Sequence, residues 1–312
     1  MEHCTEVIDL FLKTLYKNLK FLCKNDLWDI KRASEWATLE TIPEIRKLRL
    51  FNEMQQHKLL SLNADILNYN DSIDYIIDNK CSLCRFGDGE FNLINGGDVS
   101  FQKYNPQLAQ RLREILKSCF DSSDLNSNIR IAISRLYYNF SDWNNLIFPR
   151  FFEEFVFVNE DFLAEVCNPK YTYISTEISQ LYHIFREYDF ASYFDHIKEI
   201  WKDRDIAIIC GDRIFNNIEN NIFDCAKSTE YIYAPTTEAF NQYDEILNKA
   251  KKNSKEKLVI AILGPTAKLL AWDLFTLGYQ ALDFGHIAKD YDSFMNKEPR
   301  NIESVTKFFD KD

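Results

Sequence analysis

Short apolar runs alternate with helix-forming stretches from about residue 73 to about residue 296, and a hydrophilic tail follows. Continuous apolar strands that alternate with helices are typical of a parallel sheet covered on both faces. We therefore predict an α/β fold, a Rossmann-like parallel sheet flanked by helices. The expected strands lie at 129–134, 155–158, 205–210, 231–233, 257–263 and 279–282, and the expected helices at 106–119, 192–202, 238–252 and 266–277.

The first 70 residues have a different pattern. Their apolar positions repeat at helical spacing through 5–24, 29–39 and 43–66, and the segment contains no glycine. We predict a helical extension over residues 1–70, followed by the main domain over 71–312. The extension could serve as a helical cap on the protein or as a contact between copies in a homo-oligomer. Alternatively, a basic-faced helix could make a peripheral membrane contact.

Composition narrows the class of protein. The net charge of −11 argues against a nucleic-acid partner. A phosphate-bearing ligand would then need a cation between it and the acidic chain. No run reaches the ~18 apolar residues needed to cross a bilayer. The eight cysteines are scattered, and Cys81 and Cys84 lack a second pair at zinc-site spacing. We therefore expect reduced thiols and a cytoplasmic or membrane-peripheral location.

One glycine-rich stretch, Arg85–Glu90, carries the strongest chemical signal. In an extended backbone Asp88 and Glu90 would point to the same face. Paired carboxylate oxygens suit Mg²⁺ or Mn²⁺, which share their remaining positions with phosphates. Gly87 lets a ligand approach the backbone, and Arg85 can neutralise an anion. The alternative interpretation is an ordinary surface turn.

Other candidate groups follow strands, where ligands of parallel sheets bind. Gly264, Pro265 and Thr266 open a helix whose free N–H groups would favour a diphosphate, although many strand–helix joins look like this. Arg213 follows the 205–210 strand and fits either a phosphate contact or a surface ion pair.

The last predicted strand is followed by Asp283 and His286. The histidine can ligate a metal, hold a phosphate or assist proton transfer. We expect His183 and His196, in aromatic helical sequence, to be structural. The candidates for stacking on a sugar or base are Phe101, Tyr104, Tyr137 and Tyr182.

Several separated motifs stand in order along residues 70–296. They are Arg85–Ile94, Gly96-Gly97, Phe101–Tyr104, Leu108–Leu112, Ala261–Ala267, Trp272–Leu274, Leu277–Ala281, Asp283–Ile287 and Tyr291. Together they resemble the GT-D family of bacterial glycosyltransferases, once catalogued as a domain of unknown function. The resemblance implies that Asp88 and Glu90, the D-x-E motif, bind a divalent metal that holds a nucleotide-sugar diphosphate. The chain departs at Ser179–Tyr182, where Gln180 replaces an arginine of a Ser-Arg-Pro-Tyr-like stretch, which affects the donor or acceptor type.

The resemblance implies metal-dependent transfer of a hexose from a nucleotide sugar, a UDP-sugar, to a saccharide, glycan or glycoprotein acceptor. Mn²⁺ or Mg²⁺ on Asp88 and Glu90, with Arg85 and the 264–266 turn, would stabilise the leaving diphosphate. His286 and Asp283 are the candidates to deprotonate the acceptor. Two alternatives are a metal-dependent hydrolase of nucleotide sugars or phosphate esters, and a non-catalytic binding protein with a degenerate site.

Overall fold

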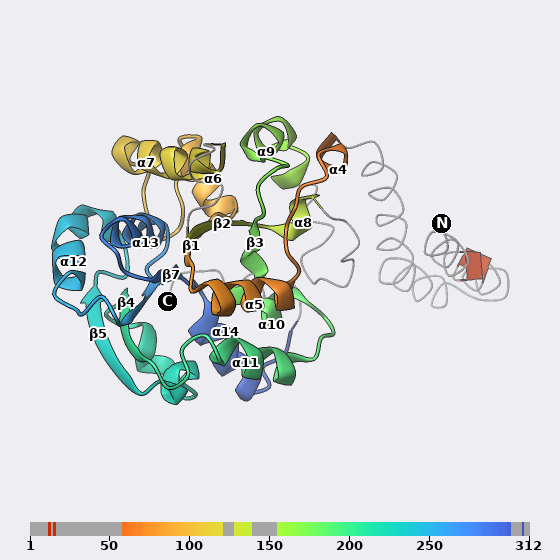
Figure 1. The fold of residues 1–312 in the computed structure, drawn as a ribbon. Coiled ribbons are helices and arrows are strands. Elements are labelled where there is room, and N and C mark those ends of the chain that lie inside the picture. The colour runs from red at the N-terminus through yellow and green to blue at the C-terminus, as the bar shows by residue number, and fades with distance from the viewer. Residues whose placement is uncertain are drawn as a thin grey trace, which may run out of the picture. The chain divides into compact units, whose positions relative to one another are not determined.

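The computed structural model describes residues 58–120, 128–138 and 155–300, together with Leu12, Lys13, Leu15, Tyr16 and Phe308 (Figure 1). The chain divides into two compact units, one of residues 1–61 and 149–160 and the other of residues 62–148 and 161–312. The short helix α4 (Lys58–Ser61) belongs to the first unit. Most of the predicted helical extension lies outside the described residues and stays a prediction.

The second unit is built on a seven-stranded sheet in which every pairing is parallel. The predicted fold class is therefore confirmed. The strands follow the order β3-β2-β1-β7-β6-β4-β5. They are β1 (Ser82–Arg85), β2 (Ile129–Ile133), β3 (Ile174–Ser175), β4 (Asp205–Gly211), β5 (Ser228–Ala234), β6 (Leu258–Ile262) and β7 (Ala281–Asp283).

The first and last strands lie side by side in the middle of this sheet, with Leu83 paired to Leu282. From β1 the chain runs outward through β2 to β3, and then crosses to β4 on the other side. The strand order therefore changes direction between β1 and β7. Ligands of open parallel sheets bind beyond the carboxyl ends of the strands at such a point.

Helices cover both faces of the sheet (Figure 1). One face carries α5 (Tyr69–Asn79), α10 (Leu181–Ile184), α11 (Phe190–Lys198) and α14 (Ile287–Met295). The other face carries α6 (Asp88–Ile94), α7 (Pro106–Lys117), α12 (Tyr243–Ala250) and α13 (Thr266–Thr276). The described helices also include α8 (Arg135–Tyr138), α9 (Glu160–Val166) and the short 3₁₀ segments η2 (Ser118–Phe120), η4 (Thr176–Ser179), η5 (Ile214–Asn217), η6 (Ile222–Cys225) and η7 (Ala239–Gln242).

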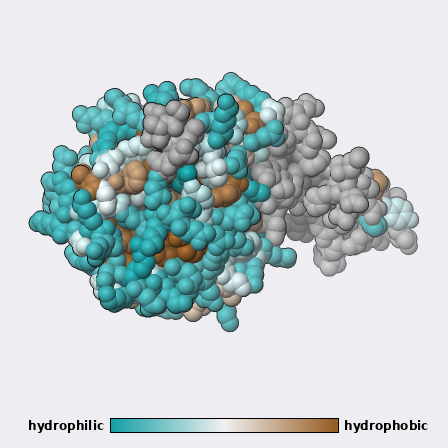
Figure 2. Space-filling view, viewed as in Figure 1, coloured by the Kyte–Doolittle hydropathy of each residue, from teal (hydrophilic) through white to brown (hydrophobic). Residues whose placement is uncertain are grey.

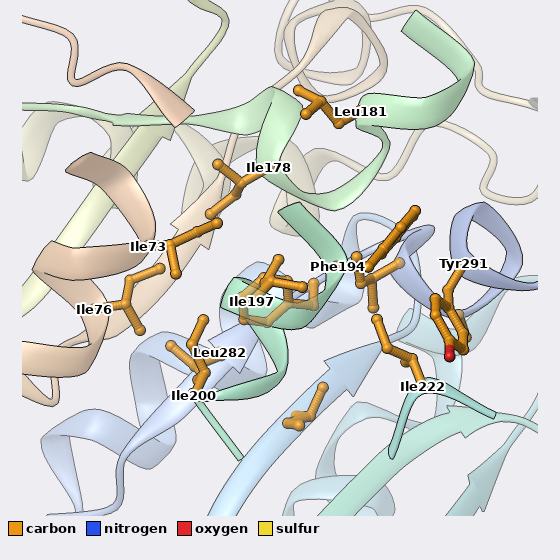
Figure 3. Close-up of a cluster of buried hydrophobic side chains, with 14 of the residues drawn as sticks. Ile73, Ile76, Ile178, Leu181, Phe194, Ile197, Ile200, Ile222, Leu282 and Tyr291 are labelled. Atoms are coloured by element: carbon orange, nitrogen blue, oxygen red, sulfur yellow. The ribbon is translucent and has the colours of Figure 1, made fainter. Parts of the chain in front are cut away.

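The core between the sheet and the α5–α14 layer is aliphatic and aromatic. Figure 3 shows Ile73 and Ile76 of α5 with Ile197 and Leu282 in this cluster. Because strand side chains alternate between faces, Leu83, Ile260 and Leu282 point to this layer, and their neighbours point to α13. On the face shown in Figure 2 the described residues present a mostly hydrophilic surface with small apolar groups. No described helix has the length and apolar character that a membrane span requires.

Three local predictions were wrong. Residues 155–158, predicted as a strand, begin with a helical turn and continue as a turn. Ile66, placed at the end of a predicted helix, instead forms a parallel bridge with Tyr173. Asp88 and Glu90 do not lie in extended backbone, because α6 begins at Asp88. The remaining predicted strands are confirmed to within a few residues.

Candidate functional site

Three buried charged side chains meet beyond the carboxyl ends of β1, β6 and β7. The Nζ atom of Lys268 lies 2.7 Å from Oε1 of Glu90 and 3.2 Å from Oδ2 of Asp283. It also donates a 3.1 Å hydrogen bond to the carbonyl oxygen of Gly264. An ammonium group has three donors, so these three acceptors use all of them. Lys268 therefore links the first turn of α6, the end of β7 and the turn after β6 in one site.

The alternation of side chains along β7 explains why Asp283 and Lys268 lie together. Asp283 is the last residue of β7, and it points to the face covered by α13, opposite to its core neighbour Leu282. Lys268 is the third residue of α13, so its ammonium group lies near the carboxyl end of β7, beside Asp283. Burial by itself would lower the pKa of Lys268, but the carboxylates of Asp283 and Glu90 raise it above its ordinary value. The lysine is therefore a buried, charged group.

The two carboxylates of the D-x-E motif have different surroundings. Glu90 is buried at the third position of α6, and its Oε2 accepts a 2.9 Å hydrogen bond from the N–H of Gly87, the residue before the helix. This reach back to the cap residue is a usual role for glutamate at that position. Both oxygens of Glu90 are thus engaged by the protein.

Asp88 is the first residue of α6, and its side chain is exposed. Protein atoms nevertheless surround the carboxyl group closely enough to desolvate it. This desolvation, together with the nearby charge of Glu90, raises the pKa of Asp88. A carboxylate that solvent reaches but does not fully stabilise gains more than usual from a cation. Asp88 is therefore the carboxylate of the motif that is available to a ligand.

Arg85 ends β1 and is buried against the turn that follows β7. Its backbone N–H donates a 3.2 Å hydrogen bond to Oδ2 of Asp283. Its Nη1 packs so closely on Gly285 that a Cβ atom there would lie 2.0 Å away. Within the described residues, Nε of Arg85 has no hydrogen-bond partner, and neither has Oδ1 of Asp283. Such buried polar atoms are costly unless water or a ligand satisfies them.

His286 lies next to Arg85, at the start of α14. Burial, followed by the positive charges of Arg85, Lys289 and Lys268, lowers the pKa of His286 to about 3. The imidazole is therefore neutral at physiological pH. Its ring lies 5.2 Å from that of Phe308, which also stacks on His183 at 3.5 Å.

His183 is held by Asp290 of α14. Its Nδ1 lies 2.6 Å from Oδ1 of Asp290, and this buried carboxylate also accepts the backbone N–H groups of Tyr182 and His183. The pair fixes α10 on α14, which agrees with the structural role predicted for His183. His196 pairs at the surface with Asp74, its Nε2 2.8 Å from Oδ1.

The turn after β6 is tightly packed. Gly264 has φ of +51°, and a Cβ atom there would lie 3.1 Å from the ring of Phe101. Thr266 is buried, and its hydroxyl has no partner among the described residues. The loop that contains Phe101 is held by Glu238, whose carboxylate accepts from the side chain of Gln102 at 3.0 Å and from the N–H of Lys103 at 2.8 Å.

Comparison with known proteins identifies the family of this site. The model of the glycosyltransferase GT-D fold matches residues 83–310. The chain belongs to the GT-D glycosyltransferase fold family. The match begins in β1 and includes every residue of the charged cluster.

Individual relatives agree with the GT-D assignment. The chain is 31% identical over 230 residues to a probable glycosyl transferase Gly of Streptococcus gordonii, and 30% identical over 227 residues to glycosyltransferase GlyD of Streptococcus pneumoniae serotype 4. These alignments cover 73% and 72% of this chain, but 33% and 27% of the relatives. The chain thus spans about a third of the length of the curated relatives it matches.

Solved GT-D structures have the same fold. One, described as the highly conserved domain of unknown function 1792 with a distinct glycosyltransferase fold, is 31% identical, with a TM-score of 0.71 over 81% of this chain and 93% of its own. Another, described as a new glycosyltransferase from Streptococcus sanguinis, is 27% identical, with a TM-score of 0.68 over 80% and 94% of the two chains.

The structure brings most of the predicted GT-D site residues together, but Arg213 lies apart. It follows β4, two positions from β7 in the sheet, and its exposed side chain lies 3.8 Å from Asp212. Tyr104 is exposed, whereas Tyr137 and Tyr182 are buried. Gln180, which replaces the arginine of the family motif, directly precedes α10. It therefore lies in the layer that contains Asp290 and His183. The functional roles predicted for these residues stay predictions.

Sequence reasoning missed two residues of the GT-D site region. Lys268 was not predicted, although a lysine directly before the apolar run Leu269–Trp272 of α13 was a usable signal. Glu177 was also missed. It lies buried beyond β3, and its carboxylate accepts hydrogen bonds from the hydroxyls of Ser134 and Ser175 and, at 3.3 Å, from the N–H of Arg135. These contacts fix the ends of β2 and β3 beside the site.

Proposed function

We propose that this chain transfers a hexose from a nucleotide sugar, a UDP-sugar, to a saccharide, glycan or glycoprotein acceptor. The observation that carries the proposal is the charge arrangement beyond β1, β6 and β7 in a GT-D chain. Arg85, Lys268 and Lys289 lie close enough to His286 to lower its pKa. Asp88 is an exposed carboxylate close to Glu90, which pairs with Lys268. This combination suits a diphosphate ligand that is accompanied by a cation.

The environment of His286 supports a diphosphate at this place. The positive charges that lower its pKa would attract an anionic ligand. The unpartnered Nε of Arg85 and the unpartnered hydroxyl of Thr266 are donors for which the described residues provide no acceptor. We assign Arg85 and the Gly264–Thr266 turn to the diphosphate, and His286 to the donor side of the site as a neutral hydrogen-bonding group.

The residues present fit a divalent cation only if the ligand shares in holding it. The described residues contain no group of three His, Cys, Asp or Glu side chains arranged to bind a metal. Mn²⁺ or Mg²⁺ bound through one or two carboxylates and substrate phosphates does not need such a group. Asp88 would hold the ion, with Glu90 beside it. The ion would supply positive charge against the leaving diphosphate.

Asp283 has a different role in this proposal from the one that its position in the sequence suggested. Its side chain is fully buried and bonded to Lys268 and to the N–H of Arg85. Although its Oδ1 has no partner among the described residues, an acceptor hydroxyl could meet this carboxylate only in the interior of the protein. We therefore assign Asp283 to holding Lys268 and β1 in place, and leave the acceptor base unassigned.

A product assay tests the proposal. The purified chain is incubated with UDP-hexoses and Mn²⁺, with and without saccharide acceptors, and both UDP and free sugar are measured. Transfer predicts that UDP release rises with acceptor and that a glycosylated product forms. Release of free sugar at full rate without acceptor would instead identify a hydrolase. No metal-dependent binding of UDP or any UDP-sugar would favour a binding protein with a degenerate site.

A further inference from the structure

We propose that Lys268 is a positioning residue that keeps Glu90 out of direct contact with a bound cation, so that Asp88 is the carboxylate that ligates the ion. This inference rests on the proposed function, because it concerns how the same site receives its cation. Asp88 would bind the ion directly, whereas Glu90 would act only indirectly. The D-x-E motif by itself does not distinguish these two roles.

The geometry around Glu90 carries the argument. One carboxylate oxygen lies 2.7 Å from the Lys268 ammonium, and the other accepts the Gly87 N–H at 2.9 Å. A divalent ion bonded directly to Oε1 at ~2.1 Å would lie beside that ammonium group. Two positive charges so close together in a buried place repel strongly. Direct ligation through Oε1 would therefore require Lys268 to leave, and ligation through Oε2 would compete with the Gly87 N–H.

Lys268 is held too firmly to leave easily. Its three donors are used by Glu90, by Asp283 at 3.2 Å and by the carbonyl oxygen of Gly264 at 3.1 Å. These acceptors belong to three different segments: the first turn of α6, the end of β7 and the turn after β6. Moving the ammonium group would leave two buried carboxylates without a counterion, which is strongly unfavourable. Asp88 makes no such ion pair among the described residues, and its side chain is exposed.

Glu90 then acts on the ion indirectly. Its bond to the N–H of Gly87 fixes the turn that precedes Asp88, so it sets the place from which Asp88 reaches the ligand. Its negative charge also lies near Asp88, which favours a cation without a direct bond. Lys268 fixes this arrangement by holding Glu90 against α13.

Direct measurement of Mn²⁺ binding tests the inference. Free Mn²⁺ is followed by electron paramagnetic resonance, with and without UDP, on the full chain and on folded variants. We expect Asp88→Asn to weaken Mn²⁺ binding by ~100-fold or more, and Glu90→Gln by less than ~10-fold, because only the first removes a direct ligand. We expect Lys268→Met to bind Mn²⁺ alone at least ~10-fold more tightly, because two carboxylates lose their counterion.

A matched control separates this effect from a general loss of stability. Arg111 makes a 2.6 Å ion pair with Asp273, which lies in α13 beyond Lys268. Arg111 itself lies in α7, so Arg111→Met removes a partly buried cation that pairs with α13 without touching the three strand ends. It should leave Mn²⁺ affinity unchanged. Lys268→Arg, which keeps the charge, should keep Mn²⁺ affinity much closer to that of the wild type than Lys268→Met does.

The outcomes are distinct. If Glu90→Gln weakens Mn²⁺ binding as much as Asp88→Asn does, or if folded Lys268→Met binds Mn²⁺ as the wild type does, the inference is overturned while the proposed function stands. If the wild type binds no Mn²⁺ with or without UDP, the metal-dependent function fails as well. The Glu90→Gln comparison holds even if Lys268→Met does not fold.

Discussion

The Nζ atom of Lys268 lies 2.7 Å from Oε1 of Glu90, although 178 positions separate the two residues in the chain, from 90 to 268. Asp88, two positions before Glu90, has an exposed side chain and no counterpart of this ion pair among the described residues. The two carboxylates of the motif therefore contribute to folding with opposite signs. Glu90 stabilises the fold through its partners, whereas ionised Asp88 is held in a place that disfavours its charge.

Asp88→Asn should make the protein more stable at neutral pH and inactive. Desolvation by the surrounding protein atoms and the charge of Glu90 raise the pKa of Asp88, so its ionised form costs stability once the pH rises through the folded pKa. The gain from the substitution should disappear below the unfolded pKa of about 3.9, where the carboxyl is protonated in both states. Thermal unfolding at several pH values measures this. Turnover should fall by ~10²-fold or more.

Glu90→Gln should lower stability instead. The substitution removes the charge that faces the Lys268 ammonium and weakens the bond to the Gly87 N–H, so we expect a loss of about 1–3 kcal/mol. Urea unfolding of both variants at pH 7 makes the comparison. Equal shifts of the same sign for Asp88→Asn and Glu90→Gln would contradict the assignment of one paired and one unpaired carboxylate.

His286 should make the fold sensitive to acid. Its pKa is lowered to about 3 in the folded protein, below the ordinary value of about 6.5. Stability from this residue is therefore complete above pH ~6.5 and is lost as the pH falls toward the folded value, by up to ~1.4 kcal/mol per pH unit. His286→Asn should flatten the dependence of unfolding free energy on pH between 6.5 and 4. His196→Asn, at the surface pair with Asp74, is the control.

Gly285→Ala should weaken UDP binding by displacing Arg85. The new Cβ would lie 2.0 Å from Nη1 of the arginine, and the residue has φ of +43°. Gly96→Ala is a matched control, because Gly96 also has positive φ, +92°, but a Cβ there meets nothing within 4 Å. Both variants should lose ~1 kcal/mol from backbone strain. Calorimetric titration should show weaker UDP binding only for Gly285→Ala, and equal binding by both would remove Arg85 from the ligand site.

The sheet could be predicted because its strands are continuous apolar runs, such as 205–210 and 257–263, that parallel pairing buries on both faces. Two strands gave little signal. β3 has two residues, and β1 ends in the charged Arg85. At 155–158 a strand was predicted where the structure has none, since the apolar residues of this run are equally compatible with a helical turn.

The site was predictable only in part. Position after a strand correctly selected Arg85, Asp283 and Gly264 as neighbours, because the topology brings those strand ends together. The conformation at Asp88 was predicted wrongly because glycines at 87 and 89 favour an extended turn as readily as a helix start. The ion pair of Lys268 could not be predicted, since it depends on which strand lies beside which.

The central claim is that UDP and a divalent cation occupy one site, with the cation between Asp88 and the diphosphate. Calorimetric titration of UDP into metal-stripped protein, before and after addition of Mn²⁺, tests it most directly. We predict that UDP binds the wild type only when Mn²⁺ is present, and that Asp88→Asn binds neither way. Equally tight binding of UDP by the metal-stripped wild type, or by Asp88→Asn with Mn²⁺, would contradict the account.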